Sequence, residues 1–230
     1  MKTSIQVKDG SGKLSRRKAP EWPAILDAVY DVSNAPLLRF VDLLLDDDYL
    51  LIDAARLSYR HQLGFFKIVL STDVLGRCLR LHLWDAESVV NEDIHSHCAD
   101  FSSRVILGRL TENLYKLSVG ASYARFRYKF DAAQRCSMAV MEGLTGAVLR
   151  SSCVVNSGDV YSKRITDIHN VSDVDQGTLT VSAWDVRRAE ACVLKENINS
   201  SSEDCSAPVG MSEDELRNVL CDIKKRIIGR

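Results

Sequence analysis

The sequence predicts an all-β core, an antiparallel β-barrel, with helices before it and one helix after it. Three patterns predict this fold. From Trp22 to about Leu63, apolar residues recur three and four positions apart, which indicates amphipathic helices. From Phe65 onward, short segments rich in Val, Ile, Leu, Phe and Tyr alternate with Gly and polar turns, which is typical of an all-β barrel or sandwich. Ser212 and Glu215 then form a capping box at the start of a last helix.

These patterns divide the chain into a disordered basic arm (1–20), a helical N-terminal extension (21–64), the barrel (65–194), a linker (195–210) and a C-terminal helix (211–230). The arm has almost no apolar residue to bury, and the linker is rich in Ser, Asn and acidic residues. In the extension we expect two or three short helices, the second beginning at Pro36 and ending at the acidic run 46–48. The expected strands span residues 65–71, 78–84, 103–109, 111–118, 122–130, 146–155, 159–162, 178–184 and 189–194.

Composition narrows the class of partner. The chain has 230 residues, of which 46% are hydrophobic, enough for one substantial core. Its 30 basic residues nearly balance 31 acidic ones, which argues against a nucleic acid or an anionic membrane as partner. No apolar run approaches the roughly 20 residues that span a bilayer, and the first residues are polar where a signal peptide would be apolar. We therefore expect a cytoplasmic monomer or homodimer that binds a small molecule.

Cysteine usage predicts reduced thiols. The seven cysteines are an odd number, lie far apart and form no Cys-x-x-Cys pair. This distribution is unlike a disulfide framework or a zinc finger.

The histidines indicate a metal site. His95 and His97 form a His-x-His pair, and on an extended strand their side chains would share one face and bind a single ion. Taken alone, such a pair is more often surface decoration. A second element, a Gly-Asp turn at Gly158 followed by His169, makes a two-part pattern. His61 follows a helix, where a capping or packing role is expected.

This two-part pattern resembles the cupin family. Residues 94–110 are similar to the first cupin motif, two histidines followed by a glycine turn, and residues 158–171 are similar to the second. Within the cupins, residues 65–184 look most like the thiol dioxygenases of the cysteine dioxygenase type. The resemblance implies a jelly-roll barrel that holds one divalent metal ion through three histidines: His95, His97 and His169.

The resemblance also implies the chemistry. Three neutral imidazoles would leave Fe(II) with its charge and open coordination positions, which suits O2 and a small carboxylate-bearing amino acid or thiol. The same ligands also suit Zn, Mn, Ni or Cu. The family's glutamate ligand is missing, and Asp100 follows His97 by three residues. Asp100 is a candidate for a fourth ligand or for a hydrogen bond to an imidazole N–H.

Two cations are candidates for binding the substrate carboxylate. Alternation puts Arg80, His82 and Trp84 on one face of a strand, facing either the lumen or solvent. In the lumen, Arg80 would bind a carboxylate and His82 would act as acid, base or extra ligand. The resemblance instead points to Lys67, at the position of the family's carboxylate-binding arginine. We favour Arg80. The same alternation predicts that Cys98 points away from the metal.

Other positions depart from the thiol dioxygenases. Val186 lies near the position of their active-site tyrosine, and Trp184 replaces a histidine. These departures keep several functions open beside a non-haem Fe(II) oxygenase. The alternatives are a non-redox isomerase or lyase, a natural-product cupin for oxidative rearrangement or N–N bond formation, and a regulatory barrel that binds a small ligand without turnover.

Overall fold

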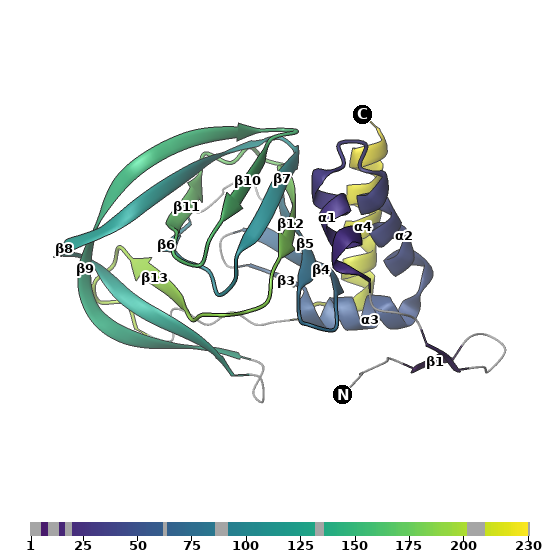
Figure 1. Cartoon of the computed structure of the whole chain (residues 1–230), viewed down its shortest axis with the longest axis horizontal. Helices are drawn as coiled ribbons and strands as arrows, with labels where there is room; N and C mark the ends of the chain where they lie inside the picture. Colours follow the sequence, from purple (N-terminus) through teal and green to yellow (C-terminus); the bar gives the residue numbers. More distant parts are fainter. Residues whose placement is uncertain are drawn as a thin grey trace.

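A computed structural model describes residues 20–61, 64–85, 92–131, 136–201 and 210–229, together with two short strands at residues 6–8 and 14–16. Two antiparallel sheets face each other, and a layer of helices covers the outer face of one of them (Figure 1). The fold is therefore a jelly-roll β-barrel with flanking helices, as the sequence predicts.

The first sheet lies between the helices and the lumen. Its strand order is β10 (Val160–Lys163), β7 (Phe101–Leu107), β12 (Leu179–Trp184), β5 (Cys78–Trp84), β4 (Phe65–Thr72) and β3 (Tyr59–Arg60). In β5, Leu79, Leu81 and Leu83 are buried against the helices, whereas Arg80 and His82 line the lumen. The alternation of β5 thus sends its polar side chains to the inside of the barrel.

The second sheet closes the other side of the barrel. Its strand order is β11 (Ile168–Ser172), β6 (Ile94–His95), β13 (Ala191–Lys195), β8 (Arg109–Asp131) and β9 (Cys136–Asn156), and β11 also pairs with β8. Phe65, Trp84 and Val105 of the first sheet pack against Leu110 and Val171 of the second. This inner core holds the two sheets together around the lumen.

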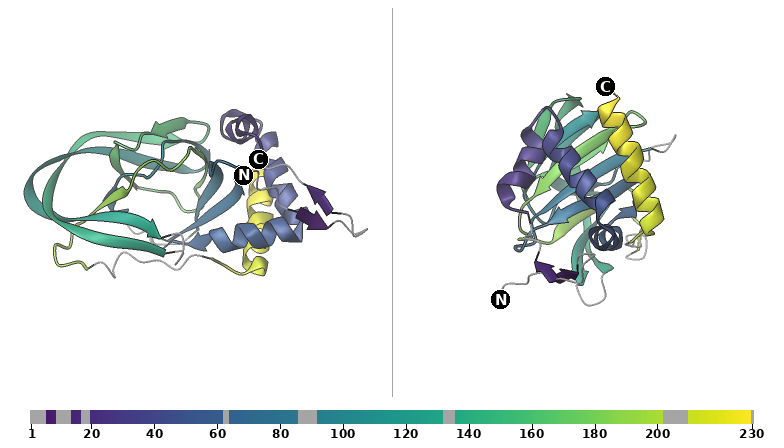
Figure 2. Two further views of the ribbon diagram at one scale, coloured as in Figure 1. Left: turned by 60° about the horizontal axis from the view of Figure 1, so that its bottom comes forward. Right: turned by 90° about the vertical axis from the view of Figure 1, so that its right-hand side faces the viewer.

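The helices pack on the outer face of the first sheet, as Figure 2 shows. They are α1 (Trp22–Tyr30), α2 (Ala35–Asp46), α3 (Asp48–Leu57) and α4 (Glu213–Ile228). The Asp47 side chain accepts from the first-turn amides of α3, and the Ser212 hydroxyl accepts from the amide of Glu215, 3.2 Å away. The buried side of α4, Leu216, Leu220 and Ile223, joins the core between helices and sheet. The N-terminal extension and the last helix therefore form one layer.

A buried arginine joins this layer to the sheet. Arg104 of β7 is 2% exposed, and its guanidinium donates to the carbonyls of Val29 and Asp31 and to the Asn34 side chain. Burial lowers the pKa of Arg104, and Asp31 opposes the shift. Since these carbonyls lie where α1 ends, Arg104 satisfies acceptors that the helix leaves unpaired.

Several strands differ from the sequence expectation. The segments expected as two strands, 111–118 and 122–130, are one strand, β8, because residues 119–122 form a bulge between Ser118 and Tyr123. β9 begins at Cys136 rather than at residue 146, and strands β3, β6 and β11 were not expected. The strand expected at 103–109 ends earlier, because Gly108 turns with φ +74.

The remaining expectations concern termini, membrane and thiols. Much of the arm at 1–20 and residues 202–209 of the linker lie outside the described residues, but 6–8 and 14–16 pair as an antiparallel hairpin, β1 and β2. None of the described helices is long and apolar enough to cross a membrane. The cysteines that the structure describes are free thiols: Cys78, Cys98, Cys153, Cys192 and Cys221. Cys205 and the side chain of Cys136 lie outside the described part.

Candidate metal centre

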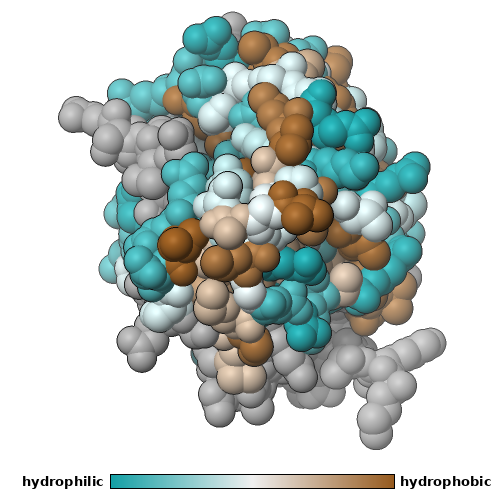
Figure 3. All heavy atoms as spheres, turned by 90° about the vertical axis from the view of Figure 1, so that its left-hand side faces the viewer, coloured by the Kyte–Doolittle hydropathy of each residue, from teal (hydrophilic) through white to brown (hydrophobic). Residues whose placement is uncertain are grey.

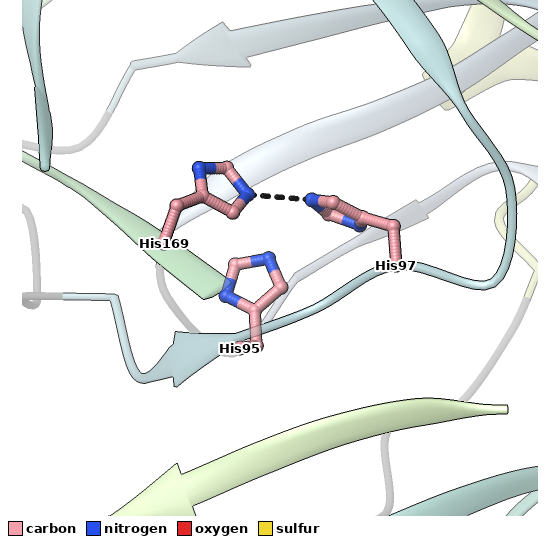
Figure 4. A group of neighbouring side chains, drawn as sticks. All are labelled: His95, His97 and His169. Carbon is pink, nitrogen blue, oxygen red and sulfur yellow. Dashed lines mark hydrogen bonds between the residues drawn. The ribbon is translucent and has the colours of Figure 1, made fainter. Parts of the chain in front are cut away.

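Three histidines meet inside the barrel (Figure 4). His95 on β6 pairs directly with His169 on β11, and His97 follows two residues after His95. Their candidate ligand nitrogens all lie within 4.8 Å of one another. Nitrogens bound to one ion at about 2.0–2.1 Å lie at most about 4 Å apart, so small rotations of the rings suffice to bring all three onto one ion.

Hydrogen bonds orient two of the three rings. Nδ1 of His95 lies 2.8 Å from the Asp93 carbonyl, and Nδ1 of His169 lies 2.8 Å from Oε1 of Glu112. Because carbonyl and carboxylate oxygens only accept, both Nδ1 atoms carry the proton and both Nε2 atoms present a lone pair. Nε2 of His97 lies 2.6 Å from Nε2 of His169. The candidate ligand nitrogens of the three histidines therefore point at one region.

The protonation state also fits a metal site. Burial lowers the pKa of His95 and holds the pKa of His97 well below its usual value, with neighbouring imidazoles adding to the effect at His97. Neutral imidazole is the form that binds a metal ion. The residues present thus fit a divalent cation of borderline softness.

A buried carboxylate supports His169 from behind. Glu112 on β8 is 6% exposed, and its Oε1 also lies 2.8 Å from Nζ of Lys163. This arrangement is the carboxylate–histidine pairing that commonly backs a metal ligand. The sequence prediction missed both Glu112 and Lys163. A signal was present, because Leu110 faces the core and Glu112, two residues later on the same strand, shares that face.

A cavity of about 270 Å³ adjoins the cluster, and His95 and His97 are in its wall. Lys67, Arg80 and His82 also line it. In the pairing of β4 with β5, Lys67 lies opposite His82. Both candidate cations therefore face the lumen rather than the solvent.

Neither cation has a carboxylate partner among the described residues. The Arg80 guanidinium lies 4.2 Å from the centre of the Trp184 ring, and its Nε donates to Sγ of Cys78 at 3.1 Å. Nζ of Lys67 donates to the Tyr59 hydroxyl at 3.2 Å. The cavity wall therefore carries two positive charges available to an anion.

Two further imidazoles in the wall are neutral. Burial, then Lys67 and Arg80, hold the pKa of His82 well below its usual value. Burial and Lys67 lower the pKa of His61 to about 3. The His61 ring stacks on Phe65 at 4.5 Å, a packing contact of the kind expected, although this ring also lines the cavity. His82 is outside the cluster of candidate ligands.

The structure bears on the expectations for two neighbours of His97, which are Asp100 and Cys98. The Asp100 carboxylate accepts from the amide of Ile165 at 2.8 Å, and Glu112 makes the imidazole contact for which Asp100 was a candidate. Cys98 is among the residues that line the cavity, and the direction of its side chain relative to the cluster stays a prediction. Because β6 ends at His95, strand alternation does not extend to Cys98.

The sequence matches no protein-family model, and no curated protein matches it either. Solved structures with a similar chain path include an oxalate oxidase, with 12% identity, a TM-score of 0.35 and coverage of 74% of this chain and 75% of that one. A structure of DMSP lyases has 13% identity, a TM-score of 0.35 and coverage of 71% and 91%. A cupin-like protein from Thermotoga maritima has 11% identity, a TM-score of 0.30 and coverage of 70% and 92%. These similarities are distant, so function has to rest on the residues of this site.

Proposed function

We propose that this chain is a metal-dependent enzyme in which His95, His97 and His169 hold one divalent ion. The observation that carries the proposal is the convergence of three imidazoles beside a cavity lined by Arg80 and Lys67, which have no carboxylate partner among the described residues. A small anionic molecule, such as a carboxylate-bearing amino acid or thiol, would fit such a wall.

For the ion we propose Fe(II), on the basis of the resemblance to the thiol dioxygenases and of the three-nitrogen ligand set. A ferrous ion so held keeps open coordination positions, at which an anionic substrate and O2 can be brought together. Zn, Mn, Ni and Cu remain compatible with the same nitrogens.

The protein groups have separate tasks in this proposal. Glu112 holds the proton on Nδ1 of His169, so that Nε2 stays free for the ion. Arg80 binds and orients the substrate carboxylate, and Lys67, in the same cavity wall, binds a more distant polar group of the substrate. Trp184 stacks on Phe101 with the ring centres 4.3 Å apart, and this aromatic wall keeps water from one side of the centre.

A non-redox lyase or isomerase reaction is the second candidate. It is favoured by His61 and His82, two neutral imidazoles in the cavity wall, of which His82 lies beside both cations. A neutral imidazole can donate and accept hydrogen bonds to a bound substrate without any change in the ion.

Metal analysis of protein purified without oxygen tests the proposal directly. We expect about one divalent ion per chain, and its loss in His97→Ala and His169→Ala with an unchanged circular dichroism spectrum, because the apolar core does not depend on an ion. His61→Ala is the matched control, since this ring lies in the cavity wall outside the cluster. Metal-free wild-type protein after reconstitution with each ion would refute the metal centre.

The metal content then decides between the two reaction classes. Iron together with oxygen uptake on addition of small amino acids or thiols supports the oxygenase. Turnover without oxygen uptake, or full activity with Zn, supports the non-redox reaction. Stoichiometric metal with no turnover of any amino acid or thiol in the screen would contradict this substrate class.

A further inference from the structure

One long strand lies at the edge of the second sheet. β9 has 21 residues and pairs with β8 alone among the described strands. The backbone donors and acceptors on its other side therefore have no strand partner within the described chain. Exposed edges of this kind invite pairing with another chain, and proteins usually protect them with charged residues or proline.

β9 has little of this protection. Its 21 residues include no proline and only two charged residues, Glu142 and Arg150. Its large apolar side chains are between 44% and 55% exposed: Met138, Val140, Met141, Leu144, Val148, Leu149 and Val154. Figure 3 shows hydrophobic side chains spread over the face of the molecule to which β8 and β9 belong. Such a surface is unusual for a strand that remains in water.

We propose that β9 is a homodimer interface, in which β9 of one copy pairs antiparallel with β9 of a second copy about a two-fold axis at Gly146. The charges support this register. Glu142 and Arg150 lie equally far from Gly146 on either side, so each Glu142 would face Arg150 of the second copy. Arg150 has no ion pair within the described chain, whereas Glu142 already contacts Arg125 at 3.0 Å and Arg127 at 2.8 Å, so Arg150 of the second copy would join this group of charges.

Four of the seven exposed apolar residues of β9 support the same register. With Gly146 on the axis, Leu144 faces Val148 of the second copy, and Met138 faces Val154. Gly146 is also the midpoint of β9 itself, so the whole strand is used. Because an isologous interface must be complementary to itself, this internal symmetry favours a second copy over an unrelated partner.

The bulges of β9 are also symmetric. In the pairing with β8, Leu114 faces Ser151 and Tyr115 faces Leu149, which leaves Arg150 as an extra residue. On the other side of Gly146, Glu142 is extra in the same way, since Arg125 faces Gly143 and Phe126 faces Met141. A regular strand would fit such an edge poorly. A second β9 carries the same two irregularities at matching distances from the axis.

The surface available for pairing extends along the whole strand. Seven half-exposed apolar side chains and an open backbone edge are spread over the 21 residues of β9. None of the β9 side chains that the structure describes lines the cavity beside the histidines. The interface and the proposed metal centre can therefore be tested independently.

Sedimentation of the full-length protein at micromolar concentration tests the interface. We expect a dimer, and a shift to monomer in Val148→Lys, which places two charges in the apolar centre. Val74→Lys is the matched control, because Val74 is also an exposed valine but lies on the β4–β5 turn, away from β9. Both variants should keep the metal content of the wild type. A monomeric wild type, or a Val148→Lys variant as dimeric as the control, would overturn the proposal.

Cysteine crosslinking tests the register. Leu144→Cys and Val148→Cys proteins, mixed and oxidised, should form a covalent heterodimer on a non-reducing gel, whereas either variant alone should match the wild type. This comparison accounts for the native cysteines. Crosslinking of each variant with itself, or none in the mixture, would exclude an axis at Gly146.

Discussion

The Glu112 carboxylate accepts a hydrogen bond from Nδ1–H of His169 at 2.8 Å and contacts Nζ of Lys163 at the same distance. All three side chains are buried or nearly so. Glu112 therefore sets which nitrogen of His169 faces the other two imidazoles, and Lys163 balances its charge. Such support from outside the ligand set commonly governs how tightly a centre holds its ion.

Removing this carboxylate should weaken metal binding without removing a ligand. We expect Glu112→Ala to lower metal affinity by about 10–100-fold. Glu112→Gln should recover part of the loss, because its amide oxygen can still accept the His169 proton. Competition with a metal-binding dye measures both, with Glu142→Gln on β9 as control. Equal affinity of wild type and Glu112→Ala would show that His169 needs no such support.

The neutral histidines predict acid sensitivity of the metal-free protein. His61 has a folded pKa of about 3, below the unfolded value near 6.5, so below that value the unfolded chain binds a proton that the folded chain does not. The stabilising contribution is complete above about pH 6.5 and falls as the pH decreases from there toward about 3. In that window, each such group lowers the free energy of unfolding by about 1.4 kcal/mol for every unit by which the pH falls.

His61→Phe isolates one share of this effect. The stacked partner Phe65 tolerates an aromatic ring in its place, and the titrating group is lost. Between about pH 7.5 and about pH 5.5, the free energy of unfolding should fall by roughly 1 kcal/mol less in the variant than in the wild type. Urea denaturation at the two pH values measures the difference. Parallel losses in both proteins would mean that His61 is not held neutral by the fold.

Arg104 should be needed for the helical layer and not for the site. Arg104→Met removes the donors to the carbonyls of Val29 and Asp31, and each buried acceptor left unpaired costs about 1–3 kcal/mol. We expect a lower midpoint of chemical denaturation and unchanged metal content in the folded protein. Arg109→Met is the control, because its pairing with Asp175 is exposed. A midpoint equal to that of the control would contradict a structural task for Arg104.

The sequence predicted those parts of the site that depend on regular local geometry. Arg80 and His82 face the lumen together because β5 is a regular strand of seven residues. Strand alternation does not apply to Cys98, because the strand containing His95 has only two residues. Strand alternation predicts the direction of a side chain only for residues that lie within the strand.

Contacts distant in sequence could not be predicted in this way. Glu112 and His169 are separated by 57 positions and meet only because β8 pairs with β11. The first half of β9 was missed for another reason. Gly143 and Gly146 interrupt its apolar pattern, whereas in the structure they are accommodated by pairing with β8. Tertiary pairing overrides local preference at both places.

The last prediction concerns the two cations in the cavity wall. Sequence alternation favoured Arg80 and the family resemblance favoured Lys67, and the structure has both side chains lining the same cavity. Arg80 acts electrostatically on a candidate ligand, because its charge contributes to the low pKa of His97. The charge of Lys67 instead lowers the pKa of His61 and His82. We therefore expect Arg80 to bind the carboxylate closest to the ion and Lys67 to bind a more distant polar group.

Substrate-dependent oxygen uptake by Arg80→Lys and Lys67→Ala separates these tasks. Arg80→Lys keeps the charge but loses the planar fork and with it one of the two charge-assisted hydrogen bonds to the carboxylate, which should cost about 1.5–3 kcal/mol in substrate binding. Lys67→Ala should raise KM by a smaller factor, because the Tyr59 hydroxyl beside it remains as a polar group. Arg109→Lys, outside the cavity, should behave as the wild type. Normal kinetics in both cavity variants would mean that neither cation holds the substrate, and a larger loss in Lys67→Ala would reverse the assignment.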